Sequence, residues 1–215
     1  MFEQREIYRD IKEHKMKYLV NLPNDCEDKD NKKWPLMLFL HGAGERGDNL
    51  DDIKKYGVHR YLERKDIPFV VVSPQCPKDT FWDIHIKDLI SIIKEVKTKY
   101  SIDDKKIYLV GISMGGHCAW NFAMQYPKLF AAVMPIAGGP MLSNYAERIK
   151  DIPIWTIHGK KDKVVSVEKS REIVFELQQL NGNIKYTEDS NSGHEICTTI
   201  FEKEEIYEWL LNQSK

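Results

Sequence analysis

Long apolar segments are missing from this sequence. No apolar run approaches the roughly 20 residues that span a bilayer, so we expect no membrane partner. A secretory signal would begin with a basic stretch followed by an apolar one, whereas residues 1–10 carry alternating charges. We therefore expect the cytoplasm as the compartment, unless a leader was removed.

The sequence also has little excess charge and few cysteines. Its formal net charge of -1 at pH 7 creates no field strong enough to gather phosphate groups, so we expect no nucleic-acid partner. The four cysteines are scattered without close pairs, which favours free thiols over a zinc site or a disulfide framework. We expect no metal ion and no cofactor, and the sequence leaves the oligomeric state open.

The composition is that of an ordinary globular protein. Aliphatic and aromatic residues make up 42% of the chain and charged residues 30%, which excludes a mainly disordered or fibrous chain. A length of 215 residues suits one domain with a single sizeable core. We therefore expect residues 1–215 to form one domain.

Short apolar runs, each bounded by turn residues, alternate along the chain with segments of helical spacing. The runs cover residues 35–40, 68–72, 107–110, 131–136, 154–157 and 184–187. Runs that are apolar throughout indicate strands covered on both faces. Their alternation with amphipathic helices predicts an α/β fold with a mostly parallel, doubly wound sheet.

The remaining connections predict an N-terminal antiparallel hairpin and no lid domain. Residues 7–11 and 16–22 read as an antiparallel pair of strands that turns near Glu13 and His14. Residues 137–153 have room for only one short helix, at 143–150, so no lid fits there. Any cover must come from the long connections at residues 42–65 or 74–84, and we expect an open groove suited to a small or extended soluble substrate.

The strongest local signal is the sequence Gly-Ile-Ser-Met-Gly-Gly at residues 111–116. It follows an apolar run and precedes a helical segment, which is the context of a nucleophile elbow. A serine on this tight turn holds its hydroxyl clear of the sheet, and Gly111 and Gly115 leave room for the turn. Ser113 is therefore the candidate nucleophile, and a plain glycine-rich turn or a phosphate-binding loop is the alternative.

A serine hydroxyl is a poor nucleophile, so it needs a base within reach and an acid that orients this base. Asp162 lies in the loop after the run 154–157, and His194 follows the run 184–187. Loops at the carboxyl ends of parallel strands are where such sheets place their functional groups. We therefore predict that Asp162 and His194 complete a catalytic triad.

Other acidic residues and histidines fit these roles less well. Asp151 precedes its strand and would lie at the wrong end of the sheet, and Asp189 fits a turn. His158 stands at a strand end, where a packed and hydrogen-bonded core residue is more common than a proton shuttle.

Acyl transfer also needs N–H donors aimed at the developing oxyanion, and losing one donor typically costs about 10²–10³ in rate. The sequence His-Gly-Ala-Gly at residues 41–44 directly follows an apolar run. Small residues here let the backbone approach a substrate. We expect the N–H groups of Ala43 and Met114 to form the oxyanion hole, with Gly44 as the alternative to Ala43; an ordinary glycine-rich turn is the competing interpretation.

These motifs together resemble the α/β-hydrolase superfamily. Residues 38–49, the Ser-Pro-Gln-Cys-Pro run at 73–77 and the Phe-Trp pair at 81–82 look like its carboxylesterase branch. That branch is similar to feruloyl and acetylxylan esterases and to polyhydroxybutyrate depolymerases. The resemblance extends from about Tyr18 to the final helix, and it implies an α/β-hydrolase fold with esterase activity on short or aromatic acyl groups.

Several side chains near these motifs have two interpretations. The loop at residues 41–49, which carries the predicted donor Ala43, is called the oxyanion loop below. We expect Glu45, Arg46 and Asp48 to brace this loop through internal ion pairs, although Glu45 is also a candidate substrate contact. Trp82 either forms a wall of the substrate pocket or packs structurally at its rim. Cys197 is close to His194 in sequence, yet a cysteine nucleophile would have to occupy the elbow.

The residues predict a serine carboxylesterase that hydrolyses small soluble esters through an acyl-enzyme on Ser113. The acyl group would be short or aromatic, of the feruloyl type. A serine peptidase acting on small peptides and an acyl-protein thioesterase-like hydrolase are alternatives, although the thioesterase elbow usually has Gln where this chain has Met114. A non-catalytic binding protein on the same fold is the third alternative.

Overall fold

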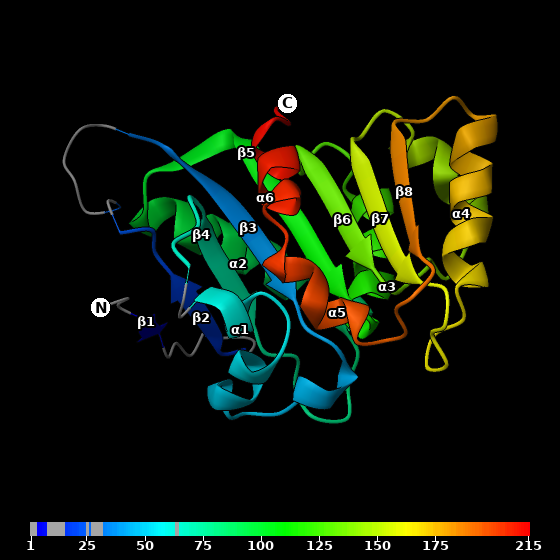
Figure 1. Ribbon diagram of the computed structural model, residues 1–215. Coiled ribbons are helices and arrows are strands. Elements are labelled where there is room, and N and C mark those ends of the chain that lie inside the picture. Colours follow the sequence, from blue (N-terminus) through cyan, green and yellow to red (C-terminus); the bar gives the residue numbers. More distant parts are fainter. Residues whose placement is uncertain (1–3, 8–15, 25, 27–31, 63–64) are drawn as a thin grey trace.

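The backbone forms one mixed sheet of eight strands (Figure 1). A computed structural model describes residues 4–7, 16–24, 26, 32–62 and 65–215. The strands lie in the order β1-β2-β4-β3-β5-β6-β7-β8. Strand β2 is antiparallel to both of its neighbours, β1 and β4, and all neighbouring strands from β4 to β8 are parallel. They are β1 (Gln4–Ile7), β2 (Tyr18–Asn21), β3 (Trp34–Leu40), β4 (Val70–Pro74), β5 (Ile102–Ile112), β6 (Ala132–Ile136), β7 (Ile154–Gly159) and β8 (Ile184–Asp189). This is the α/β-hydrolase fold that the sequence predicts.

Helices cover both faces of the sheet. The α-helices are α1 (His59–Leu62), α2 (Ile86–Lys99), α3 (Met114–Gln125), α4 (Glu168–Gln179), α5 (Ile196–Thr199) and α6 (Glu204–Leu211). Short 3₁₀ helices are η1 (Ala43–Glu45), η2 (Leu50–Lys55), η3 (Trp82–His85), η4 (Ser143–Ile149) and η5 (Ile200–Glu202). Helices α2, α3 and α4 pack on one face, and α1, α5 and α6 pack on the other (Figure 1).

The central strand β3 shows why the core has two halves. Successive side chains of a strand point to opposite faces. Leu36, Leu38 and Leu40 therefore pack with α2 and α3, while Met37 and Phe39 pack with the helices of the opposite face. All five side chains are fully buried, as the uninterrupted apolar run requires of a strand covered on both sides.

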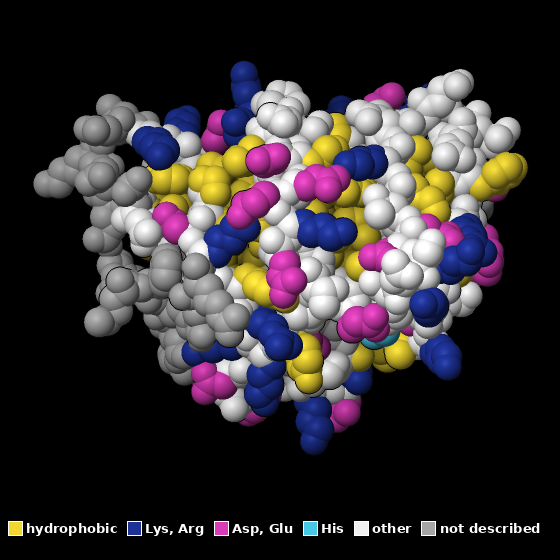
Figure 2. Space-filling model, viewed as in Figure 1, with side chains coloured by type: hydrophobic (Ala, Val, Ile, Leu, Met, Phe, Trp, Pro, Cys, Tyr) yellow, Lys and Arg dark blue, Asp and Glu magenta, His cyan; other side chains and the backbone are white. Residues whose placement is uncertain are grey.

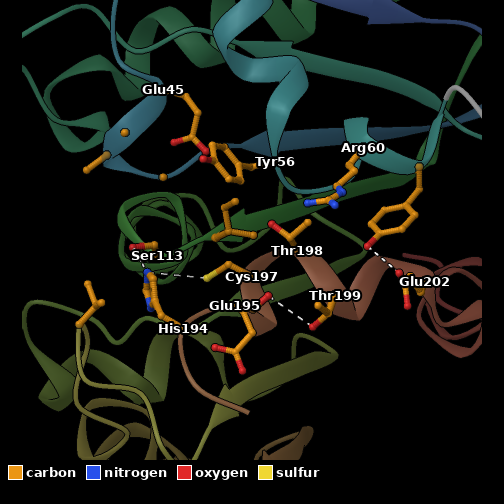
Figure 3. A pocket seen from close by; sticks show the side chains of 16 residues that line it. Glu45, Tyr56, Arg60, Ser113, His194, Glu195, Cys197, Thr198, Thr199 and Glu202 are labelled. Atoms are coloured by element: carbon orange, nitrogen blue, oxygen red, sulfur yellow. Dashed lines mark hydrogen bonds between the residues drawn. The ribbon is translucent and has the colours of Figure 1, made fainter.

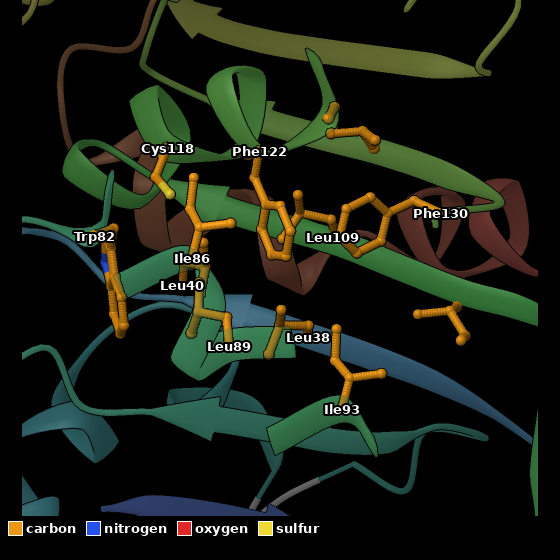
Figure 4. Packing of buried hydrophobic residues seen from close by; sticks show 14 of the residues in the cluster. Leu38, Leu40, Trp82, Ile86, Leu89, Ile93, Leu109, Cys118, Phe122 and Phe130 are labelled. Carbon is orange, nitrogen blue, oxygen red and sulfur yellow. The ribbon is translucent and has the colours of Figure 1, made fainter. Parts of the chain in front are cut away.

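Aliphatic and aromatic side chains together fill the core between the sheet and the helices α2 and α3 (Figure 4). The ring of Phe122 on α3 meets Phe130 edge-to-face, with 4.9 Å between ring centroids, and meets Tyr126 in the same manner at 5.7 Å. Leu89 of α2 and Leu38 of β3 belong to the same cluster. This packing fixes α3, and with it the turn at its first residue.

The predicted strands are present, with two corrections. Strand β5 starts at Ile102, well before the apolar run at 107–110, because its polar first half extends past most of the sheet and pairs only at Trp34. The first N-terminal strand is β1 at Gln4–Ile7, so it starts earlier than the predicted strand at 7–11, of which residues 8–11 lie outside the described part of the chain. The expected turn at Glu13 and His14 lies outside the described residues.

The connection from β6 to β7 carries only the short helix η4, so no lid domain is inserted there.

The face seen in Figure 2 shows acidic and basic side chains interspersed, without a large region of one sign. Among the described residues, no helix is both long and apolar enough to cross a membrane.

Replacing Phe122 tests the packing that fixes α3. We expect Phe122→Ala to lower the free energy of unfolding by about 3–5 kcal/mol, because a large cavity opens in a close-packed core. Phe175→Ala is the matched control, since this phenylalanine lies on α4 with 58% of its surface exposed, and its loss should cost about 0.5 kcal/mol or less. Urea unfolding followed by circular dichroism measures both, and equal losses would contradict the assignment of Phe122 to the core.

Candidate active site

Ser113 occupies a sharp turn between β5 and α3. Its backbone angles, φ 51° and ψ −114°, are ones that a side chain-bearing residue rarely adopts, and such strain costs on the order of 1–3 kcal/mol. The turn is held by two hydrogen bonds: the Ser113 N–H donates to the carbonyl of Ile136 at 2.9 Å, and the His117 N–H donates to the carbonyl of Ser113 at 2.9 Å. The half-buried hydroxyl therefore has a fixed position at the edge of the sheet.

The glycines around Ser113 are required by close backbone packing. A Cβ atom on Gly111 would overlap the carbonyl oxygen of Gly115, and one on Gly115 would overlap that of Leu40 in the neighbouring strand. Because these obstacles are backbone atoms, they cannot move aside as a side chain can. The elbow is therefore possible only with glycine at both positions, as the motif predicts.

The structure brings the other two predicted triad residues to Ser113. His194 Nε2 lies 3.0 Å from Ser113 Oγ, and His194 Nδ1 lies 2.7 Å from Asp162 Oδ2. The Asp162 carboxylate accepts the Nδ1–H, which leaves the Nε2 lone pair free to accept the hydroxyl proton. Both residues stand in loops after the carboxyl ends of β7 and β8, where parallel sheets place functional groups.

Asp162 is a buried carboxylate with several hydrogen-bond donors. Its Oδ1 accepts the backbone N–H groups of Val164 at 2.8 Å and Val165 at 2.9 Å. Burial opposes the charge, but the hydrogen bonds from His194 and from these two N–H groups outweigh it and hold the pKa of Asp162 below its ordinary value. The carboxylate is therefore ionised at neutral pH and aimed at the imidazole.

The predicted oxyanion donors are the first residues of two helices. Ala43 begins η1 and Met114 begins α3, and the first N–H groups of a helix have no partner within it. Gly44, the alternative donor, follows in the same first turn. The loop passes beside the serine, because a Cβ atom on Gly42 would lie 3.6 Å from the Cβ of Ser113. Ala43 and Gly44 line the same cavity as Ser113, and Met114 directly follows the serine.

The oxyanion loop is braced by hydrogen bonds to its carbonyl groups. Gln75 Nε2 donates to the carbonyls of Glu45 and Asn49, each at 2.9 Å, and Arg46 donates to those of Ala43 at 2.9 Å and Thr80 at 3.1 Å. Within the described part of the chain, no ion pair joins Glu45, Arg46 and Asp48 to one another. The expectation of internal ion pairs was therefore wrong, because the guanidinium serves backbone acceptors instead.

His41 ties the same loop to the strand beneath it. Its Nε2 accepts the Cys76 N–H at 3.0 Å, so the ring proton is on Nδ1 and is donated to the Gly42 carbonyl at 2.6 Å. Burial lowers the pKa of His41 to about 4, so the imidazole is neutral. Glu45, whose carboxyl lies 3.9 Å from this ring, therefore has no cationic partner there.

The two candidate substrate contacts have different outcomes. Trp82 is completely buried, donates its Nε1–H to the carbonyl of His41 at 3.0 Å and does not line the cavity at Ser113. The idea of Trp82 as a pocket wall was therefore wrong, and its role is to support the oxyanion loop. Glu45 does line the cavity, and burial is the main cause that raises the pKa of its carboxyl.

A cavity of about 580 Å³ opens at Ser113 (Figure 3). One side is formed by the loop and short helices between β3 and β4, including Glu45, Tyr56 and Arg60. The opposite side is formed by the His194 loop and by α5, with Thr198 among its residues. Described residues of the connection 42–65, one of the two from which the sequence allowed a cover to come, thus line the cavity, whereas α5 had no recognisable signal in the sequence.

Two further residues contact the triad. His158 is completely buried and hydrogen-bonded at both ring nitrogens, as predicted, but its approach to Asp162 was missed. Cys197 Sγ lies 4.0 Å from His194 Nε2, and burial raises the pKa of this thiol, so the thiolate is strongly disfavoured. Within the described residues, no group of three or more His, Cys, Asp and Glu side chains could hold a metal ion.

Comparison with known proteins places this site in a family context. The profile of the phospholipase/carboxylesterase family matches residues 71–210. A bifunctional acetylxylan esterase/xylanase of Neocallimastix patriciarum is 30% identical over 146 residues, which cover 63% of this chain and 20% of that protein. The chain thus spans only a fifth of the length of that relative.

Solved structures show the same fold over the whole chain. A thermostable esterase has 33% sequence identity and a TM-score of 0.83, covering all of this chain and 63% of its own. The feruloyl esterase module from Clostridium thermocellum, complexed with sinapinate, has 16% identity and a TM-score of 0.76, covering 97% of this chain and 87% of its own. At that identity the second likeness concerns the fold alone.

Replacing Gly115 tests the geometry of the elbow. We expect Gly115→Ala to lower the free energy of unfolding by about 3 kcal/mol or more, because the added methyl group meets a backbone carbonyl that cannot yield. Gly44→Ala is the matched control, since nothing lies within 4 Å of a Cβ built there, and its stability should stay within about 0.5 kcal/mol of the wild type. Chemical denaturation measures both variants, and a Gly115→Ala protein of unchanged stability would rule out the close packing of α3 on β3.

Proposed function

Because the chain belongs to the phospholipase/carboxylesterase family, we propose that it hydrolyses small carboxylic esters through an acyl-enzyme on Ser113. The observation that carries the proposal is the position of His194, 3.0 Å from the serine hydroxyl and 2.7 Å from a buried carboxylate. This arrangement gives a weak nucleophile its base and gives the base its orientation.

The proposed reaction uses each of these atoms in turn. Ser113 Oγ attacks the ester carbonyl while His194 Nε2 takes its proton, and Asp162 stabilises the imidazolium that forms. The N–H groups of Ala43 and Met114 bind the oxyanion of the tetrahedral intermediate. The imidazolium then protonates the leaving alcohol, and a water molecule, activated by the same nitrogen, releases the acid and restores the serine.

The cavity supports a small substrate. Its volume of about 580 Å³ lies within the range of roughly 300–1,000 Å³ typical of small-molecule sites. Apolar parts of Tyr56, Ile112 and Val164 line it next to the serine. We infer a short or aromatic acyl group, a range that the acetylxylan and feruloyl esterases among the similar proteins also suggest by their names.

The proposed mechanism predicts which serine is needed for activity and for labelling by a covalent probe. We expect Ser113→Ala to lower kcat/KM for p-nitrophenyl acetate by at least about 10³-fold and to abolish labelling by a fluorophosphonate probe, because it removes the hydroxyl that His194 Nε2 contacts. Ser101→Ala, at an exposed serine that precedes β5 and so stands at the opposite end of this strand from the elbow, is the matched control and should keep both activity and labelling. A labelled or fully active Ser113→Ala protein would refute the mechanism.

The inferred substrate size predicts the effect of narrowing the cavity. Val164 lines it with 71% of its surface exposed, so Val164→Trp adds bulk without disturbing the core. We expect turnover of p-nitrophenyl butyrate and methyl ferulate to fall at least about 10-fold more than that of p-nitrophenyl acetate, because the larger acyl groups compete with the indole for space. Ile84→Trp, equally exposed but outside the cavity, is the control. A uniform loss across all three esters would contradict this role of the cavity.

A further inference from the structure

His158 is a second histidine at the candidate triad. It is the fifth residue of β7, and none of its surface is exposed. Its Nε2 lies 3.3 Å from Asp162 Oδ2 and 3.0 Å from the carbonyl oxygen of Val165, while its Nδ1 lies 2.7 Å from Ser170 Oγ. The oxygen that accepts the His194 proton is therefore shared between two imidazole rings.

Counting protons identifies the tautomer of His158. Both groups that face Nε2 are acceptors, the Val165 carbonyl and the Asp162 carboxylate, so a bare nitrogen there would meet only repulsion. The Ser170 hydroxyl, which faces Nδ1, has a second acceptor in the Gly138 carbonyl at 3.0 Å, so it is the two acceptors at Nε2 that place the ring proton. Because burial lowers the pKa of His158, the ring is neutral and carries its one proton on Nε2.

We infer that His158 is a positioning residue of the proposed triad, which uses its Nε2–H to hold the Asp162 carboxylate in the orientation that His194 requires. The inference rests on the proposed function. Asp162 Oδ1 accepts the N–H groups of Val164 and Val165, and Oδ2 accepts the Nδ1–H of His194. The Nε2–H of His158, which faces the Val165 carbonyl at 3.0 Å, lies 3.3 Å from the same Oδ2 and is shared between the two acceptors. With donors on both oxygens, the carboxylate cannot rotate without breaking at least one hydrogen bond.

The shared oxygen also affects the basicity of His194. A donor on Oδ2 draws part of the carboxylate charge away from the His194 imidazolium, which is then less stabilised. Removing this donor should leave more of the carboxylate charge to stabilise the imidazolium and move the acid limb of the kcat/KM profile to higher pH. The other titratable groups that act on His194 are Glu45, Glu195 and Cys197, and they stay unchanged in the variants used below.

Two amide variants of His158 distinguish the loss of its contact with Asp162 from the other effects of replacing the ring. The amide nitrogen of His158→Gln can take the place of Nε2, whereas that of His158→Asn reaches only the place of Nδ1, beside Ser170. We expect His158→Asn to lower kcat for p-nitrophenyl acetate roughly 10-fold, with KM within about twofold, and to shift the acid limb upward. His158→Gln should keep kcat within about threefold of the wild type and leave the limb in place.

His59→Gln is the matched control, because His59 is another buried histidine, with Nε2 2.7 Å from Ser73 Oγ and no contact with Asp162. Its pH profile should match that of the wild type. If His158→Asn has the wild-type kcat and pH profile, or if His158→Gln is impaired as strongly as His158→Asn, the inference is overturned.

Nitrogen-15 NMR of the wild-type imidazoles tests the inference without any variant. We expect the His158 signals of a neutral ring with hydrogen on Nε2 throughout the pH range of the activity profile. A proton on Nδ1 alone would overturn the inference, even if both amide variants failed to fold. Since this measurement needs no ester, failure of the His158 contact can be distinguished from failure of the proposed function, in which the wild type itself would neither turn over esters nor react with the fluorophosphonate.

Discussion

The close contact of α3 with β3 is the constraint on which the candidate site depends. It leaves no space for a side chain at Gly115, and it forces Ser113 into backbone angles that are strained for a residue with a Cβ atom. The cost is small beside the burial of Phe122 and the other apolar residues that fix α3 on the sheet. The burial of apolar side chains, which is large and has no preferred direction, thus holds the strained turn at Ser113 in place.

The parallel sheet explains why residues distant in sequence meet at one point. The elbow, the oxyanion loop and the loops of Asp162 and His194 all follow the carboxyl ends of parallel strands, and those ends lie along one edge. Strand spacing therefore sets the approximate distances between these loops. Local hydrogen bonds supply the remaining precision, from Gln75 to the oxyanion loop and from two backbone N–H groups to Asp162.

The sheet and the positions of Ser113, Asp162 and His194 could be predicted because each requires particular residue types at particular places in the sequence. A strand covered on both faces needs an uninterrupted apolar run, and the elbow needs glycines where backbones touch. The supporting residues leave no such signal, because many side chains can donate one hydrogen bond. Trp82 was misplaced for this reason, since an indole suits a pocket wall as well as a buried donor, and the extent of β5 was missed because its first half is polar. The cavity wall at α5 arises from tertiary packing of a four-residue helix, which is too short to show a period.

Two carboxyl groups at the candidate site, those of Asp162 and Glu45, lie in environments with opposite effects. Asp162 receives hydrogen bonds on both oxygens, which keep it charged despite burial, whereas Glu45 is buried beside a neutral His41, and its pKa is raised toward the protonated form. In the proposed reaction, positive charge develops on His194 and negative charge develops next to the oxyanion loop that contains Glu45. A full negative charge helps at the first place and hinders at the second. The environments of Asp162 and Glu45 thus match the charges that would develop beside them in the proposed reaction. Their places in the sequence do not show this difference, because it arises from the groups that surround each carboxyl in the fold.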